Sequence, residues 1–363
     1  MTREEIREQF PDSPLDRWVP ENELLLQADA HYHELMNDRI LLENALWAGI
    51  PEEWFPGIIL SAECIRRRPP NFPASFYSLA RYLLLREEYD AFRFRYWPDP
   101  VSCMGDFAAL FYVILSLECV DVLRMRHADA GIPQHITRDT CESIGSKAHD
   151  YFFFHNRPGT MKWALWWFRH HVHGRLYRTG RLEFILKKLH KNLFLKDQTL
   201  ICNNPLSPEI VTVLKARGGR HSAGDHGLGP DSWMLDVHIP GGGGLSMESI
   251  RHSFLQGIDF FSRHYPDRYI AGFESVSWIF SPDLEAVYPA GSNLIRFRDK
   301  VHTFPVESRD IEGLQFIFGT FSENHADWPE KTSVQRKLKQ HIVSGGKFRM
   351  AGMVLPRDEL DSW

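Results

Sequence analysis

The sequence predicts an α+β protein in which an all-helical N-terminal domain precedes a mixed α/β C-terminal domain. Apolar residues recur at helical spacings over about the first 130 residues, whereas short strand-like runs appear after about residue 175. The chain of 363 residues is long enough for about two domains of roughly 150 residues each. The turn-rich segment Gly131–Ile136 is the expected boundary. We therefore predict domains at residues 1–134 and 135–356, followed by a short tail at 357–363.

Three helices are expected in the N-terminal domain. In each of them apolar side chains recur three or four residues apart, and breaks rich in proline or glycine separate the segments. The longest apolar stretch, Phe107–Leu117, is about half as long as a membrane-spanning helix needs to be, so it predicts a buried helix. The expected helices are Glu23–Gly49, Phe76–Tyr89 and Phe107–Met125.

The C-terminal part alternates strands and helices. Trp233–Pro240 is the clearest strand, because its apolar residues alternate with a face that carries Asp236 and His238. Four glycines, Gly241–Gly244, follow this strand directly, and Ser246 is a suitable N-cap for the helix after them. The other expected strands are Arg181–Leu186, Gln198–Cys202, Tyr269–Phe280, Asn293–Arg298 and Phe348–Leu355; the expected helices begin at Thr137 or Asp139 and cover Ser246–His264 and Thr332–Ser344.

The composition excludes several classes of protein. Hydrophobic residues make up 43% and charged residues 25% of the chain, which is typical of a folded globular protein and not of a disordered or collagen-like one. The net charge of −5 makes nucleic acid and anionic membrane surfaces poor partners. Five cysteines without a CxxC pair argue against a disulfide framework, and the N-terminus lacks the apolar core of a secretory signal. These features favour a cytoplasmic protein.

The glycine run between strand and helix is the first candidate site. A helix N-terminus offers unpaired N–H groups and a partial positive charge, and glycines let a phosphate approach the backbone closely. The spacing fits neither the Walker pattern nor the GxGxxG dinucleotide fingerprint. A flexible surface loop is an equal alternative on the local sequence.

Two neighbouring strands carry side chains suited to acid–base chemistry. Asp236 and His238 share one strand face, and a histidine beside a carboxylate can act as a general base. On the next strand Glu274 could activate a nucleophile, and Ser277 could donate a hydrogen bond to an oxyanion. Tyr288 could protonate a thiolate leaving group, although an interface tyrosine is the simpler assignment. Taken singly, each of the strand residues is also compatible with an ordinary, partly exposed position.

Two further groups of residues have simpler interpretations. His170 and His173 could share a helix face and a metal ion, but no acidic ligand or HExxH motif lies at a matching spacing, so no metal is expected. Arg175, Arg178 and Arg181 could meet an anionic ligand, but ion pairs at the surface or between domains are the preferred interpretation.

Five segments carry a resemblance to a known family. They are GRLYRTGRLEFIL (174–186), LDVHIPGGGGLSMESIRHSF (235–254), SVSWIFSPDL (275–284), GSNLIRF (291–297) and WPEKTSVQRKLKQHIVSGGKFRMAGMVLP (328–356). With these segments the chain resembles a bacterial two-domain family of predicted N-acyltransferases, in which a helical N-acyltransferase N-terminal domain precedes a GNAT-like C-terminal domain. Over the first 130 or so residues the resemblance is looser and rests on helical character.

The resemblance implies an acyltransferase that uses acyl-coenzyme A. In GNAT folds one strand splays from its neighbour, the loop and helix after it hold the pyrophosphate of coenzyme A, and a deprotonated amine attacks the thioester directly. His238 matches a place where the base occurs, Glu274 is the second choice, and Ser277 completes the expected catalytic set. The expected cofactor-binding residues are Ile239, Gly241, Gly242, Gly243, Gly244, Leu245 and Ser246.

One departure from the family pattern keeps two functions open. The usual pyrophosphate signature has Arg or Gln, two residues, then Gly-x-Gly or Gly-x-Ala, and this chain has HIPGGGGLS in its place. The leading expectation is acyl transfer to a small-molecule amine, from acyl-coenzyme A or from the phosphopantetheine arm of an acyl carrier protein. The alternative is a non-catalytic GNAT-like protein that binds a ligand or scaffolds a partner. A metal-dependent hydrolase is a weaker third possibility.

Overall fold

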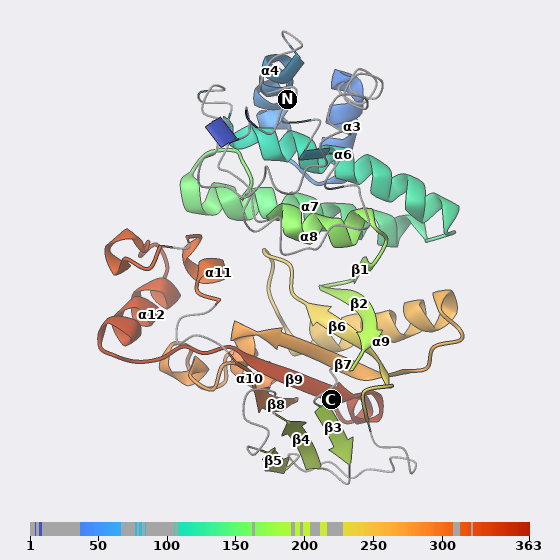
Figure 1. Cartoon of the computed structure of the whole chain (residues 1–363), viewed down its shortest axis with the longest axis vertical. Helices are drawn as coiled ribbons and strands as arrows, with labels where there is room; N and C mark the ends of the chain where they lie inside the picture. Colours follow the sequence, from blue (N-terminus) through green and yellow to red (C-terminus); the bar gives the residue numbers. More distant parts are fainter. Residues whose placement is uncertain are drawn as a thin grey trace. The chain divides into compact units, whose positions relative to one another are not determined.

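The computed structural model divides the chain into two compact units, Met1–Arg178 and Thr179–Trp363 (Figure 1). Each unit has its own secondary structure and core, and each is described by itself. The structure describes residues 4, 7, 8, 37–66, 77, 80, 81, 84, 105, 108–161, 164–189, 193–196, 199–203, 211–215, 228–307, 313–320 and 322–363.

The division between the units differs from the predicted one at 134/135. That position falls between helix α6 (Ala108–Asp129) and helix α7 (Gln134–His155), which pack against each other within the first unit. Gly131 adopts a left-handed φ of 64° in the connection. The turn-rich segment therefore joins two neighbouring helices, because a tight helix–helix turn uses the same residue types as a linker between domains.

The expected tail at 357–363 also differs, because it folds onto the second unit. Arg357–Ser362 form the short 3-10 helix η8, and Leu360 is buried. The ring of Trp363 packs against Phe254 at a centroid distance of 5.5 Å.

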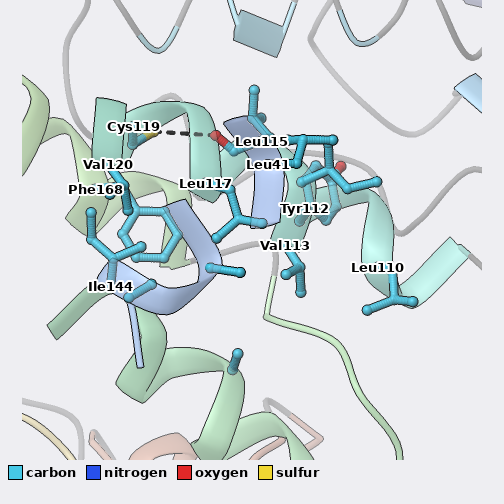
Figure 2. Packing of buried hydrophobic residues seen from close by; sticks show 14 of the residues in the cluster. Leu41, Leu110, Tyr112, Val113, Leu115, Leu117, Cys119, Val120, Ile144 and Phe168 are labelled. Atoms are coloured by element: carbon cyan, nitrogen blue, oxygen red, sulfur yellow. Dashed lines mark hydrogen bonds between the residues drawn. The ribbon is translucent and has the colours of Figure 1, made fainter. Parts of the chain in front are cut away.

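Apart from residues 176–178, which belong to a strand, the described part of the first unit is built from helices around α6. This helix is apolar on every side, so it is buried on every side over most of its length. Figure 2 shows Leu41, Ile144 and Phe168 from three other helices in the same core as Val120 and its neighbours on α6. The surrounding helices are α3 (Asp38–Trp47), α4 (Phe55–Arg66), α7 and α8 (Ala164–Val172), with the short 3-10 helix η2 (Glu52–Trp54).

The described residues test the three expected helices to different extents. The expected helix Phe107–Met125 is confirmed by α6. Residues 38–47 of the expected helix Glu23–Gly49 form α3, while residues 23–36 lie outside the described part. Of the expected helix Phe76–Tyr89 four residues are described, and all four are helical.

The second unit contains a six-stranded mixed sheet in the order β1-β2-β6-β7-β9-β8. The central pair, β6 and β7, is parallel, and the pairs β2–β6, β7–β9 and β8–β9 are antiparallel. The junction between the units falls inside β1. The strands are β1 (Leu176–Thr179), β2 (Leu182–Lys188), β6 (Trp233–His238), β7 (Ile270–Ser277), β8 (His302–Pro305) and β9 (Ala351–Pro356).

A separate antiparallel meander lies between β2 and β6 in the sequence. It consists of β3 (Leu193–Lys196), β4 (Thr199–Asn203) and β5 (Val211–Lys215), in that order in the sheet. The expected strand Gln198–Cys202 corresponds to β4. Only the backbone of these three strands is described.

Helix α9 (Met247–His264) covers one face of the large sheet. Its Phe254 lies 4.2 Å from Phe273 of β7 and 6.2 Å from Phe184 of β2, measured between ring centroids. Because side chains alternate along a strand, Asp236 and Glu274 then lie on the opposite face. The apolar face packs the core, and the polar face is left to carry chemistry.

One predicted strand is wrong. Asn293–Arg298 was expected to be a strand, and Asn293–Asp299 forms helix α10 instead. Ser292 caps this helix, because its Oγ accepts a hydrogen bond from the N–H of Ile295 at 3.4 Å. A short run with few apolar residues fits both the helical and the strand repeat of apolar positions. Ser292, as an N-cap residue, was therefore the better indication of a helix.

The remaining elements follow the predictions with shifted ends. The strand expected at Tyr269–Phe280 ends at Ser277, where the 3-10 helix η5 (Trp278–Phe280) begins. The other elements are η6 (Leu284–Ala286), α11 (Gln315–Phe318), η7 (His325–Asp327) and α12 (Ser333–Val343).

Among the described residues, no helix is long and apolar enough to cross a membrane.

Candidate active site

The parallel strands β6 and β7 separate at their carboxyl ends. Their pairing runs as far as Asp236 with Glu274, although β6 continues to His238 and β7 continues to Ser277 (Figure 1). Beyond the last pair, the side chain of Ser275 donates a hydrogen bond to the carbonyl oxygen of Val237 at 2.7 Å. Such a separation at the carboxyl ends of parallel strands is where open α/β sheets bind ligands.

Four charged or titratable side chains meet at this separation. The Nζ atom of Lys187 lies 2.9 Å from Oδ2 of Asp236 and 2.9 Å from Oε1 of Glu274. The Nε2 atom of His238 lies 3.2 Å from the same Oδ2 atom of Asp236. The strand register explains the cluster, because Asp236 is paired with Glu274 across β6 and β7, and His238 follows two residues later on the same face. Glu183 of β2, which is paired with His238, is buried on that face too.

The charges of this cluster are mutually dependent. Burial alone would raise the pKa of Asp236, but His238 and Lys187 outweigh it and lower this pKa to about 2. Burial alone would lower the pKa of Lys187, but Asp236 and Glu274 raise it above its usual value. At neutral pH the cluster therefore holds an aspartate carboxylate and a lysine ammonium. His238, whose side chain is 27% exposed, and Lys187, 41% exposed, contact the Asp236 carboxylate and can also reach a ligand, and of these two it is the imidazole that can serve as a base near neutral pH.

The glycine loop after β6 has a defined shape. Gly242 and Gly243 have left-handed φ angles of 72° and 63°, which explains why glycine stands at these positions. Arg181 donates hydrogen bonds from Nη2 to the carbonyl oxygen of Gly242 at 2.7 Å and from Nε to that of Gly244 at 3.0 Å. Helix α9 begins directly after the loop, with Ser246 Oγ accepting from the N–H of Ser249 at 3.1 Å. The loop, the start of α9 and a guanidinium group are thus next to the end of β6.

The structure brings some of the sequence-predicted residues together and leaves others apart. Both His238 and Glu274 join the cluster: His238 contacts Asp236, and Glu274 contacts Lys187. Ser277 does not join them, because alternation along β7 places it on the other face. Its Oγ accepts from the N–H of Ile279 at 3.4 Å and so caps η5. The cofactor-binding candidates at 239–246 form the connection from β6 to α9.

Tyr288 belongs to the second unit and the predicted histidine pair to the first. Tyr288 packs against a buried apolar cluster and stacks with Trp278 at a centroid distance of 6.4 Å. Burial raises the pKa of Tyr288 to about 12, so its phenol keeps its proton at neutral pH. Of the predicted pair His170 and His173 in the first unit, His170 on α8 is half-buried and His173, just after the helix, is buried. No group of three or more His, Cys, Asp or Glu side chains that could hold a metal ion occurs within the described ranges.

Sequence reasoning missed Lys187 and Glu183. The predicted strand ended at Leu186, so Lys187 lay outside it, and β2 actually runs to Lys188. Their alternation with buried residues such as Phe184 was visible in the sequence. The missing information was that β2 pairs with β6, which is a contact between segments about fifty residues apart.

Comparisons with known proteins cover both parts of the chain. Residues 176–355 match the family model described as a GNAT-like C-terminal domain, and residues 77–174 match that of an N-acyltransferase N-terminal domain. The two matches meet within a few residues of the division between the compact units. No curated protein matches this chain in sequence.

Solved structures of acyltransferases share the fold over almost the whole chain. A mutant acyltransferase in complex with octanoyl-CoA is 20% identical and has a TM-score of 0.69, over 98% of this chain and 99% of that one. An acyltransferase in complex with CoA and 10C-Teicoplanin is 21% identical with a TM-score of 0.66, at the same coverage. An acyltransferase in complex with decanoyl-CoA is 21% identical with a TM-score of 0.63, again over 98% and 99% of the two chains.

Proposed function

Because the chain belongs to the family that joins an N-acyltransferase N-terminal domain to a GNAT-like C-terminal domain, we propose that it transfers an acyl group from acyl-coenzyme A to an amine of a small molecule. The observation that carries this proposal is the separation of β6 and β7, with His238 and Asp236 at its edge and the glycine loop next to it. The similar solved acyltransferases, complexed with octanoyl-CoA, decanoyl-CoA or teicoplanin, support a medium-chain thioester donor and a small-molecule acceptor. The few cysteines, with no CxxC pair, support a cytoplasmic location.

His238 is the proposed base. Its Nε2 faces the Asp236 carboxylate, so the ring can keep a proton on that nitrogen and accept one at Nδ1 from the acceptor ammonium, directly or through water. The neutral amine then attacks the thioester carbonyl carbon and forms a tetrahedral intermediate. Its collapse breaks the C–S bond, and the departing thiolate takes a proton from the imidazolium or from water. Glu274 is the second candidate base, although its carboxylate is held by Lys187.

The glycine loop and the start of α9 are the proposed pyrophosphate site. The residues are those at 239–246, whose backbone N–H groups can donate to phosphate oxygens. Arg181, hydrogen-bonded to Gly242 and Gly244, adds a positive charge beside this loop. The usual pyrophosphate signature can carry an arginine just before its glycines, and the HIPGGGG segment has none. Arg181 supplies such a cation from the turn between β1 and β2. Val276, 51% exposed on the same face as Glu274, offers apolar surface for the acyl chain beyond the thioester.

Thermal stabilisation by thioesters tests this function directly. Coenzyme A, acetyl-CoA and octanoyl-CoA are added separately, and a ligand at 100 times its Kd should stabilise the protein by about 2.7 kcal/mol. A shift that grows with acyl length supports a thioester bound along an apolar surface. No shift with any of them at millimolar concentration would exclude the coenzyme A donor. It would favour a carrier-protein donor or a non-catalytic GNAT-like scaffold.

A further inference from the structure

We propose that Lys187 is a positioning residue: its ammonium group keeps the Asp236 and Glu274 carboxylates ionised side by side, and so keeps Asp236 available as the acceptor for His238. The consequence for catalysis rests on the proposed function. The charge balance itself is a property of the folded second unit and can be measured without a substrate.

The geometry places one cation between two anions. The Lys187 Nζ atom is 2.9 Å from a carboxylate oxygen of each partner, and both carboxylates are largely dehydrated, with Asp236 15% and Glu274 5% exposed. Asp236 and Glu274 are direct partners in the β6–β7 register, so their side chains leave neighbouring strands on the same face. The oxygen of Asp236 that contacts Lys187 is also the one that lies 3.2 Å from His238.

Removal of this cation raises the affinity of the pair for a proton. Two carboxylates in neighbouring positions repel each other, and each is stabilised by a positive charge within hydrogen-bond distance. This direction holds whatever else contacts the two side chains, because the lost charge is within 3 Å of both. The pair then titrates as a unit, and a proton shared with Asp236 weakens its contact with His238.

The strand register places further charged or titratable groups of the described chain on this face. β2 contributes Glu183 next to His238, and β6 contributes His238 itself. β9 places the apolar Val354 beside Glu274, and β8 places His302 beyond it, with its Nε2 2.7 Å from Glu359. Helix α9 covers the opposite face. Within the described part of the chain, Lys187 is a cation that contacts both members of the carboxylate pair.

Thermal denaturation over pH tests the charge balance. The variants are Lys187→Met, Lys187→Arg and the double variant Lys187→Met/Glu274→Gln. In K187M the folded pair binds a proton more tightly than the unfolded chain does. Stability from that proton is present at low pH and is lost as pH rises. We therefore expect the Tm deficit of K187M to widen between pH 5 and pH 8. The widening of the Tm deficit with pH should be smaller in K187R, which keeps a positive charge. It should also be smaller in the double variant than in K187M, because one of the two carboxylates is gone.

The pH dependence of turnover tests the link to His238. In K187M the acidic limb of the kcat/KM profile should move to higher pH by about one unit, and activity should partly recover at high pH. A K187M deficit in Tm that is the same at every pH would overturn the proposal, since loss of side-chain packing alone gives that result. If the native protein shows no turnover but the Tm pattern holds, the proposed function fails and the role of Lys187 in charge balance stands.

Discussion

His238 combines three properties at one position on β6. It lies beyond the last residue pair of β6 and β7, it is partly exposed, and it is 3.2 Å from an aspartate whose pKa is lowered to about 2. A carboxylate that remains ionised at neutral pH orients the imidazole and stabilises the imidazolium that forms when the base accepts a proton.

We expect His238→Ala to lower kcat by about 100-fold or more and to leave the Kd of coenzyme A within about twofold, because the proposed base acts on the acceptor and not on the pyrophosphate. Steady-state kinetics and calorimetric titration with coenzyme A measure the two effects. His252→Ala, at an exposed position on α9, is the matched control. Unchanged kcat in the His238 variant would move the role of base to Glu274.

Asp236 predicts a pH dependence of stability. Its folded pKa of about 2 lies below the ordinary value of 3.8, so the ionised group contributes about 2 kcal/mol above that ordinary value, and this contribution is lost as pH falls towards 2. The loss of stability in Asp236→Asn, relative to the native protein, should therefore be largest between pH 5 and pH 8. It should shrink as the pH falls from 5 to 3. Denaturant unfolding at each pH measures this. A difference that does not change with pH would assign the loss to packing.

At the level of single residues, the sequence identified the groups whose chemistry is visible locally. His238 and Asp236 are two residues apart on one strand, so their proximity follows from alternation alone. Lys187 and Glu274 reach them only through pairing with other strands, which no local pattern specifies. Ser277 had a suitable side chain, but the phase of β7 places it on the face opposite Glu274.

Among the secondary-structure elements, the β6–α9 loop offers a comparison between adjacent glycines. Gly243 has a φ of 63°, whereas Gly244 lies outside the left-handed region and has nothing within 4 Å of an added Cβ atom. We expect Gly243→Ala to strain the loop by about 1 kcal/mol and to weaken coenzyme A binding several-fold, and Gly244→Ala to leave binding within about twofold. Equal effects of the two substitutions on the measured Kd would show that the shape of the loop does not matter for the ligand.

Element type was predictable wherever a boundary signal agreed with the period. The helix expected at Thr332–Ser344 is confirmed as α12, and Thr332 and Gln335 form a capping box at its start. The segment at 293–298 has too few turns for the period to decide, and Ser292 as its N-cap was overlooked. The meander β3–β5 was only partly predicted because its strands are four or five residues long.

For the whole molecule, the sequence predicted a helical part followed by a mixed sheet, because the hydrophobic period changes along the chain. It did not locate the division at 178/179, since β1 continues through that point without a linker of distinctive composition. The division follows from where contacts are made, and these depend on the folded arrangement of each unit.

The two units should differ in how their stability depends on pH. In the first unit, Glu118 of α6 is buried, with Oε2 2.6 Å from Nε of Arg81. Burial outweighs this ion pair and raises the pKa of Glu118 from 4.5 to about 7. The unfolded chain therefore loses its proton first, so the first unit becomes less stable by about 3 kcal/mol as pH rises from about 4.5 to about 7. In the second unit, the contribution of Asp236 is constant over this range, because its pKa lies below it.

Calorimetric scans at several pH values should therefore resolve two transitions that respond differently. The transition of the first unit should fall in temperature between pH 5 and pH 7 and level off above about pH 7.5, while the other changes less. Glu118→Gln replaces the titrating carboxyl group with an amide that does not ionise. It should flatten the pH dependence of the first unit's transition alone. Octanoyl-CoA should raise the transition of the second unit, which contains the β6–α9 loop. If the E118Q substitution and the thioester both act on one shared transition, the two units unfold together, and the charge of Glu118 then bears on the stability of the candidate active site as well.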